Sequence, residues 1–267
     1  MSDTSWEAIF DKYRLGQHNF DDAPYVITAA QIKDACQDFK KTSQKEVRIL
    51  CKQDTREKRP AVFRDKGLFL LPVKNGIYQI IKGEGYVDIP EIKSPLQQYA
   101  GKLDFPLVSS RKGDSEMQHL DYAYAASLVR TFAGDDSLVL TIRGRKYTPP
   151  FEFTVGGKFS VSTDKVQTEV DSGYEGRDRI VLVEAKNAAT RNTIIRQLYY
   201  PYRQWKKFTG KDVAVMFFEK RKTKGGGEYH LWQFIFEDET EYNSIALKRS
   251  ARYAISEPQS ARQAPSR

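Results

Sequence analysis

The segment 166–186 brings several acidic residues and a lysine close together in the sequence. Its pattern is typical of two strands joined by a glycine-containing turn. Because side chains alternate between the faces of a strand, Glu169 and Asp171 share one face of the first strand. Glu184 and Lys186 share a face of the second strand. Matching the apolar faces of the two strands places these four side chains together. We therefore expect three carboxylates and one ammonium group on one face of a sheet.

Such a cluster is unfavourable by itself, because like charges repel and a partly buried carboxylate loses its hydration. A divalent cation would offset both costs. Carboxylate oxygens suit Mg²⁺, which keeps several waters and favours phosphate substrates. The ammonium group of Lys186 could then reach a metal-bound water or the attacked phosphate. Together these groups indicate metal-assisted hydrolysis of a phosphodiester.

The same residues would also fit an ordinary solvated sheet face with cross-strand ion pairs. Residues 180–183 are, however, apolar on both faces of the expected strand, which is typical of a central strand. An acid and a lysine at the end of a central strand lie where open sheets place their sites. We therefore favour a functional site over a solvated surface.

The elements around this segment follow the order helix, three strands, helix, strand. The first helix begins at Ser115, where Ser115 and Gln118 match a capping box. After this core we expect a basic turn, a further strand, a helix and a flexible tail. The expected strands are 137–142, 151–155, 159–171, 180–186, 212–219 and 229–237, the later helices are 190–208 and 242–252, and the basic turn is 220–227.

The chain before this core predicts a smaller α/β region. Thr28 is a candidate N-cap for a helix that begins at Ala29. The charged loop 53–60 could touch DNA or could simply be solvated. The expected helices are 6–14 and 29–40, the strands are 46–51, 67–72 and 76–82, and residues 92–112 resemble a linker. We divide the chain into an N-terminal region (1–95), which could aid recognition of DNA, a core (96–255) and a flexible tail (256–267).

The composition favours a polyanionic partner. The 267 residues include 43 Lys plus Arg against 35 Asp plus Glu, a formal charge of +8. Nucleic acid is the commonest partner of such a chain, although the excess could also serve solubility alone. The two cysteines form no CxxC pair, so no zinc site is indicated. We expect no membrane segment and no secretory signal, and hence a cytoplasmic protein.

Asp171 followed by Glu184-Ala185-Lys186 resembles the signature of the PD-(D/E)XK nuclease superfamily. The element order resembles the αβββαβ core of that superfamily. The stretches 70–72, 82–86 and 196–203 resemble a group of its type II restriction endonucleases. The resemblance implies an α+β, restriction-endonuclease-like fold with a mixed sheet. One departure is that the proline of the signature is missing before Asp171.

The resemblance also implies roles for individual residues. Asp171, Glu184 and the carbonyl oxygen of Ala185 would hold Mg²⁺, as one or two ions, and Lys186 would orient the water and stabilise charge on the phosphate. The roles of two further acids, Glu116 and Glu169, are left open. Glu116 fits a glutamate on the first core helix or an acid favoured by the helix dipole, and Glu169 is a rival for the role of Asp171.

The implied activity is a hydrolase reaction, the sequence-specific cleavage of double-stranded DNA by a type II restriction endonuclease. It would leave 5′-phosphate and 3′-hydroxyl ends. A homodimer is expected if the target is palindromic. A cognate DNA methyltransferase is expected in the same host. The alternatives are a repair or junction nuclease of the same superfamily and a DNA-binding module without catalysis. Clustered acids that face a polyanion argue against the last reading.

Two basic stretches are candidates for DNA contacts. One helical face carries Arg196, Arg203 and Lys207. Gln197, the neighbour of Arg196 in the sequence, is a further candidate for a DNA contact or merely a polar helix position. Lys222 and Lys224 belong to the expected basic turn. Both stretches could neutralise phosphates, and both could equally be solvated surface.

Overall fold

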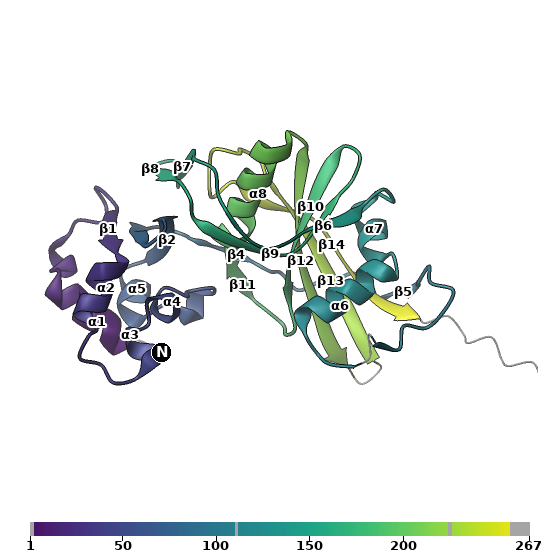
Figure 1. Cartoon of the computed structure of the whole chain (residues 1–267), viewed down its shortest axis with the longest axis horizontal. Helices are drawn as coiled ribbons and strands as arrows, with labels where there is room; N and C mark the ends of the chain where they lie inside the picture. The colour runs from purple at the N-terminus through teal and green to yellow at the C-terminus, as the bar shows by residue number, and fades with distance from the viewer. Residues whose placement is uncertain (1–2, 110–111, 224–225, 257–267) are drawn as a thin grey trace, which may run out of the picture.

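The computed structural model describes residues 3–109, 112–223 and 226–256. Its centre is a mixed seven-stranded sheet in the order β5-β14-β13-β12-β10-β9-β6, so the protein belongs to the α+β class that the sequence predicts (Figure 1). The strands of this sheet are β5 (Gln97–Ala100), β6 (Val139–Tyr147), β9 (Gln167–Glu175), β10 (Arg179–Lys186), β12 (Asp212–Thr223), β13 (Gly226–Phe236) and β14 (Ile245–Ser256).

Helices cover both faces of this sheet. On one face, α6 (Glu116–Ala125) and α7 (Leu128–Ala133) pack in a core that includes Val181 and Val183 of β10. On the other face, α8 (Arg196–Thr209) packs in a second core that includes Ile180 and Leu182. Strand β10 is therefore buried on both sides, as its continuous apolar sequence predicts.

The order of these elements agrees with the predicted order of helix, three strands, helix and strand. Strands β6, β9 and β10 are antiparallel neighbours. The chain then crosses over through α8 to β12, which pairs parallel to β10. A separate two-stranded sheet of β7 (Phe151–Val155) and β8 (Phe159–Thr163) lies between β6 and β9 in the sequence. Residues 159–171 thus form parts of two strands, and the prediction of one continuous strand is wrong.

Other predicted elements also differ from the structure, and the helix expected over residues 29–40 ends at Ala35. The sequence predicts a strand over residues 46–51, but residues 47–50 form the short helix α4 (Val47–Leu50), because the buried Val47 and Leu50 recur at a helical spacing of three. The helix expected over residues 242–252 is wrong as well, because residues 245–256 form β14, whose backbone pairs with β13 and β5. The expected linker contains β5. The expected basic turn belongs mostly to β12 and β13.

Two helix starts test the predicted caps. The hydroxyl of Thr28 accepts from the backbone N–H of Gln31 and completes a capping box on α2 (Ala29–Ala35). Ser115 caps α6 by accepting from the N–H of Gln118 at 3.2 Å. The side chain of Gln118 donates to the carbonyl of Ser109 instead of closing the box. The helix expected from residue 190 begins at Arg196, after strand β11 (Asn192–Ile194) pairs with β4 (Tyr86–Asp88).

The N-terminal region is built around a three-stranded sheet in the order β1-β3-β2. The buried side chains of β2 alternate between two cores. Leu68 and Leu70 pack in the N-terminal core, whereas Phe69 and Leu71 pack in the core beneath α8. The N-terminal region is therefore continuous with the central one. Its elements are α1 (Asp3–Lys12), η1 (Leu15–Gln17), β1 (Tyr25–Thr28), α2, α3 (Thr42–Lys45), α4, η2 (Arg56–Lys58), α5 (Ala61–Asp65), β2 (Leu68–Lys74) and β3 (Ile77–Lys82).

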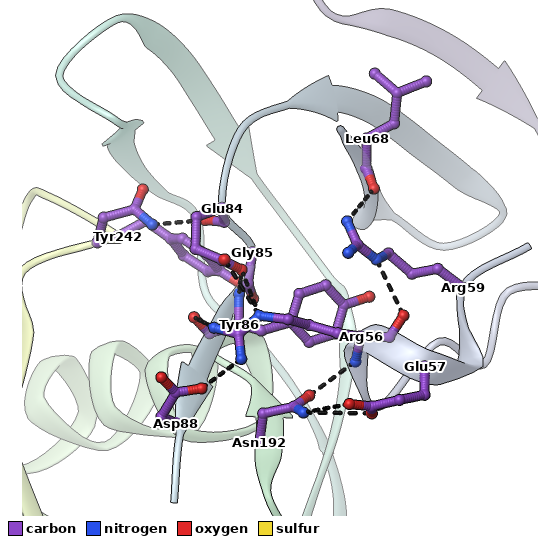
Figure 2. Close-up of polar contacts among 11 residues, drawn as sticks. Arg56, Glu57, Arg59, Leu68, Glu84, Gly85, Tyr86, Asp88, Asn192 and Tyr242 are labelled. Atoms are coloured by element: carbon purple, nitrogen blue, oxygen red, sulfur yellow. Dashed lines mark hydrogen bonds and ion pairs between the residues drawn. The ribbon is translucent and has the colours of Figure 1, made fainter. Parts of the chain in front are cut away.

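Arg56 ties η2 to the segment around β4 and to Asn192 of β11 in the central region through a polar network (Figure 2). Its backbone N–H donates to the side-chain oxygen of Asn192 at 2.7 Å. Its guanidinium group pairs with Glu84 at 3.2 Å and also with Asp88. Asn192 in turn donates its amide N–H to Glu57 at 2.9 Å. The loop 53–60 is thus held by specific bonds rather than being simply solvated.

Candidate active site

Strand β9 contains an extra residue at the position where it carries Asp171. Gly173 pairs with Ile142 of β6, and Val170 pairs with Gly144, so three steps on β9 match two steps on β6. The core contacts agree with this bulge. Val170 packs on the α8 side of the sheet and Tyr174 on the α6 side, although residues four apart share a face in a regular strand. Bulges of this kind redirect a side chain and are common next to active sites.

Asp171 approaches Glu184 because of this bulge and not because of the turn that the sequence predicts. The sequence places a turn directly after Asp171, but β9 continues to Glu175 and pairs with β10 up to Ser172 opposite Val183. The inferred matching of apolar faces is wrong, because Val170 shares a core with Leu182 and not with Val183. Asp171 nevertheless reaches β10.

The backbone connects Asp171 directly to the expected signature. The N–H of Ala185 donates to Oδ2 of Asp171 at 2.8 Å. Burial raises the pKa of Asp171 above its ordinary value, although this hydrogen bond and the charge of Lys186 act in the opposite direction. The carboxylate of Asp171 is therefore held against β10 and partly withdrawn from water.

Glu184 and Lys186 form a close ion pair at the end of β10. The Nζ of Lys186 lies 2.5 Å from Oε1 of Glu184 and donates to the carbonyl oxygen of Ala185 at 3.0 Å. Glu184 is only 8% exposed, and burial raises its pKa to about 7 despite the neighbouring ammonium group. The positive charge of Lys186 compensates a carboxylate that has lost its hydration.

The two further acids lie near this pair in different surroundings. Glu116 is the first residue of α6, and its Oε1 accepts from the backbone N–H of Asn187, just beyond β10. It is at once a helix N-terminal acid and part of the site. Glu169 precedes the bulge, is 61% exposed in its side chain, and pairs with Arg145 at 3.4 Å.

All five expected catalytic side chains line one cleft of about 750 Å³, between the central region and the N-terminal region. These are Glu116, Glu169, Asp171, Glu184 and Lys186. The cleft also receives Asp54, whose charge adds to the rise of the pKa of Glu184. The expectation that loop 53–60 could face a ligand agrees with the cleft positions of Asp54 and Lys58.

Basic side chains line the same cleft as these acids. Sequence patterns did not indicate Arg48, Lys52, Lys74 and Arg145, because they are scattered along the chain and are brought together by the fold. A sequence signal exists only for Lys58, within its charged loop, and for Arg196. The cationic lining of the cleft, besides Lys186, consists of Arg48, Lys52, Lys58, Lys74, Arg145 and Arg196.

The predicted DNA contacts divide into two groups. Arg196 and Gln197 line the cleft, and the side-chain oxygen of Gln197 accepts from the hydroxyl of Thr193 at 2.8 Å. Three others bond elsewhere: Arg203 donates to the carbonyl of Glu239 at 2.6 Å, Lys207 to the carbonyl of Pro150 at 2.8 Å, and Lys222 pairs with Asp114 at 2.5 Å. Lys224 and most of the predicted tail (257–267) lie outside the described residues.

Comparison with known proteins places the chain in a family. Residues 81–254 match the family model described as "Domain of unknown function (DUF6997)", so the chain belongs to this family. Residues 3–80 match a second model, described as "Domain of unknown function (DUF6996)". No curated protein and no solved structure matches the chain. Within the described residues, no helix is long and apolar enough to cross a membrane.

Proposed function

We propose that the protein is a Mg²⁺-dependent DNA endonuclease of the PD-(D/E)XK type. The observation that carries this proposal is the convergence of Asp171, Glu184 and Lys186 in one cleft, where β9 and β10 meet. The order of helices and strands around them, with β10 parallel to β12, supports it. Buried acids with raised pKa values beside a lysine are typical of catalytic sites.

The donor set fits Mg²⁺. The oxygens of Glu184 and of the Ala185 carbonyl already bind a cation, the ammonium group of Lys186. Among the described residues, no group of three or more His, Cys, Asp or Glu side chains is arranged to hold a metal. Two carboxylates and a carbonyl, completed by waters and substrate phosphate, are nevertheless a usual composition for Mg²⁺. Asp171, Glu184 and Ala185 would hold the ion.

The bound ion would polarise the phosphate and lower the pKa of a bound water. The chain's own residues do the rest. The N–H of Ala185 fixes the orientation of the Asp171 carboxylate. The ammonium group of Lys186 neutralises charge that develops on the phosphate while water attacks phosphorus and the P–O3′ bond breaks. The products are a 5′-phosphate and a 3′-hydroxyl end.

The finer proposal is a type II restriction endonuclease that acts on double-stranded DNA in the cytoplasm. The net charge of +8 and the cationic lining of the cleft support a nucleic-acid substrate. With a palindromic target, two copies of the chain would bind as a two-fold dimer. A cognate methyltransferase would protect the host DNA.

Sequencing the ends of cleaved DNA tests this proposal. Long linear DNA of known sequence is incubated with the protein in Mg²⁺, and the new ends are mapped. Ends that share one short sequence are the expected result. Ends at unrelated positions, or cuts confined to branched DNA, would replace restriction by a repair or junction activity. No cleavage under any metal condition would overturn the nuclease proposal itself.

A further inference from the structure

We propose that the N-terminal region forms one wall of the DNA-binding cleft and holds the phosphate backbone of duplex DNA through Lys58 and Lys74, together with Arg196 of α8. This inference rests on the proposed function and extends it, because it assigns substrate binding to elements outside the proposed catalytic centre. All three side chains line the cleft that contains Glu184 and Lys186.

These three cations have no acidic partner in the part of the chain that the structure describes. Within the described ranges, no carboxylate lies within 4.0 Å of Lys58, Lys74 or Arg196, and none of these side chains makes a hydrogen bond. The Nε of Arg196 is buried and has no hydrogen-bond acceptor. By contrast, Lys52 lies 3.7 Å from Asp54 in the same cleft. Lys58, Lys74 and Arg196 line the cleft, so an anionic ligand there could pair with the two ammonium groups and with the guanidinium group.

The fold also fixes Lys58 and Lys74 relative to the acids that line the cleft. Lys58 is the last residue of η2, which the bonds of Arg56 with Asn192 and Glu84 anchor to the central region (Figure 2). Lys74 is the last residue of β2, and the preceding Val73 packs in the core beneath α8. Such anchoring suits a surface that must hold the substrate at a set position above the site.

The lining of the cleft also bears on the kind of nucleic acid that it would bind. Proteins that bind single strands combine cations with aromatic side chains on which bases stack. Among the described residues that line this cleft, Tyr78 is the single aromatic one. Cations without a stacking platform favour contacts to the backbone of a duplex. They also offset the repulsion between DNA phosphates and the acids that line the cleft.

The test is a binding measurement by fluorescence anisotropy, with a labelled 30-base-pair duplex in Ca²⁺ instead of Mg²⁺. A triple variant, Lys58→Gln with Lys74→Gln and Arg196→Gln, should bind at least about tenfold more weakly than the unchanged protein in moderate salt. The slope of log affinity against log salt should fall by about three, one for each lost phosphate contact. Thermal melting shows whether the variant is folded.

The matched control removes three charges from the same region but outside the cleft. Lys33, Lys40 and Lys45 are exposed and do not line the cleft, so their change to Gln should leave the affinity within about twofold. Equal weakening in both triple variants would overturn the proposal, because total charge would then explain binding. Unchanged binding of the first variant would overturn it as well.

Two further outcomes separate this inference from the nuclease proposal. If the protein binds the duplex through these cations but never cleaves it, their role in DNA binding is supported and the nuclease proposal fails. If the protein cleaves DNA and the first triple variant binds normally, the wall fails and the nuclease proposal stands. Tighter binding of a single strand of the same sequence than of the duplex would overturn the choice of duplex DNA.

Discussion

At the scale of single residues, the site depends on how a buried carboxylate is compensated. Glu184 lies almost wholly out of water, and Lys186 is the cation that offsets its charge in the protein described here. The carbonyl of Ala185 shares the same ammonium group. The oxygens of Glu184 and Ala185 that we propose for Mg²⁺ thus already bind a cation, the ammonium group of Lys186.

The pKa of Glu184 predicts how the stability of the metal-free protein depends on pH. Folding raises this pKa from 4.5 to about 7, so protonated Glu184 favours the folded state. Its contribution is complete below pH 4.5 and is lost as the pH rises through 7, by up to about 3 kcal/mol. In chelator, Glu184→Gln should remove this part of the pH dependence. Matching melting profiles of both proteins between pH 4.5 and 8 would contradict the assignment.

A second prediction distinguishes the two acids of β9. Asp171 accepts from the N–H of Ala185, whereas Glu169 is exposed and paired with Arg145. We therefore expect Asp171→Asn to lower the cleavage rate at least about a hundredfold. Glu169→Gln should keep most of the activity. Rates measured across a range of Mg²⁺ concentrations compare the two variants, and the reverse order of activity would transfer the ligand role to Glu169.

At the scale of elements, a bulge in β9 decides where the first acid lies. The sequence alone indicated the central strand β10 and the cap at Thr28, because both depend on local patterns. It could not indicate the bulge, since the extra residue is defined by pairing with a strand about thirty residues away. The sequence predicts correctly that Asp171 lies near Glu184, but the matching of apolar strand faces behind this prediction is wrong.

The C-terminal strand shows the same limit more plainly. Residues 242–252 carry a spacing that is compatible with a helix, but residues 245–256 form β14, which pairs with β13 and β5. The cationic lining of the cleft likewise combines residues from 48 to 196. Pairing and packing between distant segments decide such features, and local sequence does not record them.

Gly173, next to the bulge, supplies an element-scale prediction. A Cβ on Gly173 would lie 2.7 Å from the Cβ of Ile142 on β6, too close for both strands to keep their places. Gly173→Ala should lower the free energy of unfolding by about 1–3 kcal/mol and reduce cleavage, because Asp171 lies two residues away. Gly16→Ala, at a position with open space, is the control and should melt like the unchanged protein. A Gly173→Ala protein with normal stability would contradict the tight pairing.

At the scale of the whole molecule, the N-terminal region and the central region share a core and a cleft. The side chains of β2 pack alternately into both cores, and Arg56 adds polar bonds from η2. The cleft therefore combines acids from the central region with cations from both regions. Under the proposed function, the N-terminal region would thus be part of the unit that binds the substrate.

Truncating Arg56 tests this coupling. Arg56→Ala removes its side-chain pairs with Glu84 and Asp88 and leaves the backbone bond to Asn192. We expect the free energy of unfolding to fall by about 1–3 kcal/mol, and duplex affinity to weaken because η2 carries Lys58. Denaturant titration and anisotropy measure the two effects. Arg191→Ala, at an exposed position, should change neither quantity. An Arg56→Ala protein with unaltered stability and affinity would show that the network does not position the wall.

The most direct test of the central claim is cleavage of supercoiled plasmid by the unchanged protein and by Lys186→Ala, each with Mg²⁺ and with chelator. We expect full conversion to linear products only for the unchanged protein in Mg²⁺. The rate should be at least about a hundredfold lower for Lys186→Ala, because a group that stabilises transition-state charge is lost. Lys248→Ala, an exposed lysine on β14, should cleave normally. Full cleavage by Lys186→Ala, or by the unchanged protein in chelator, would contradict the account.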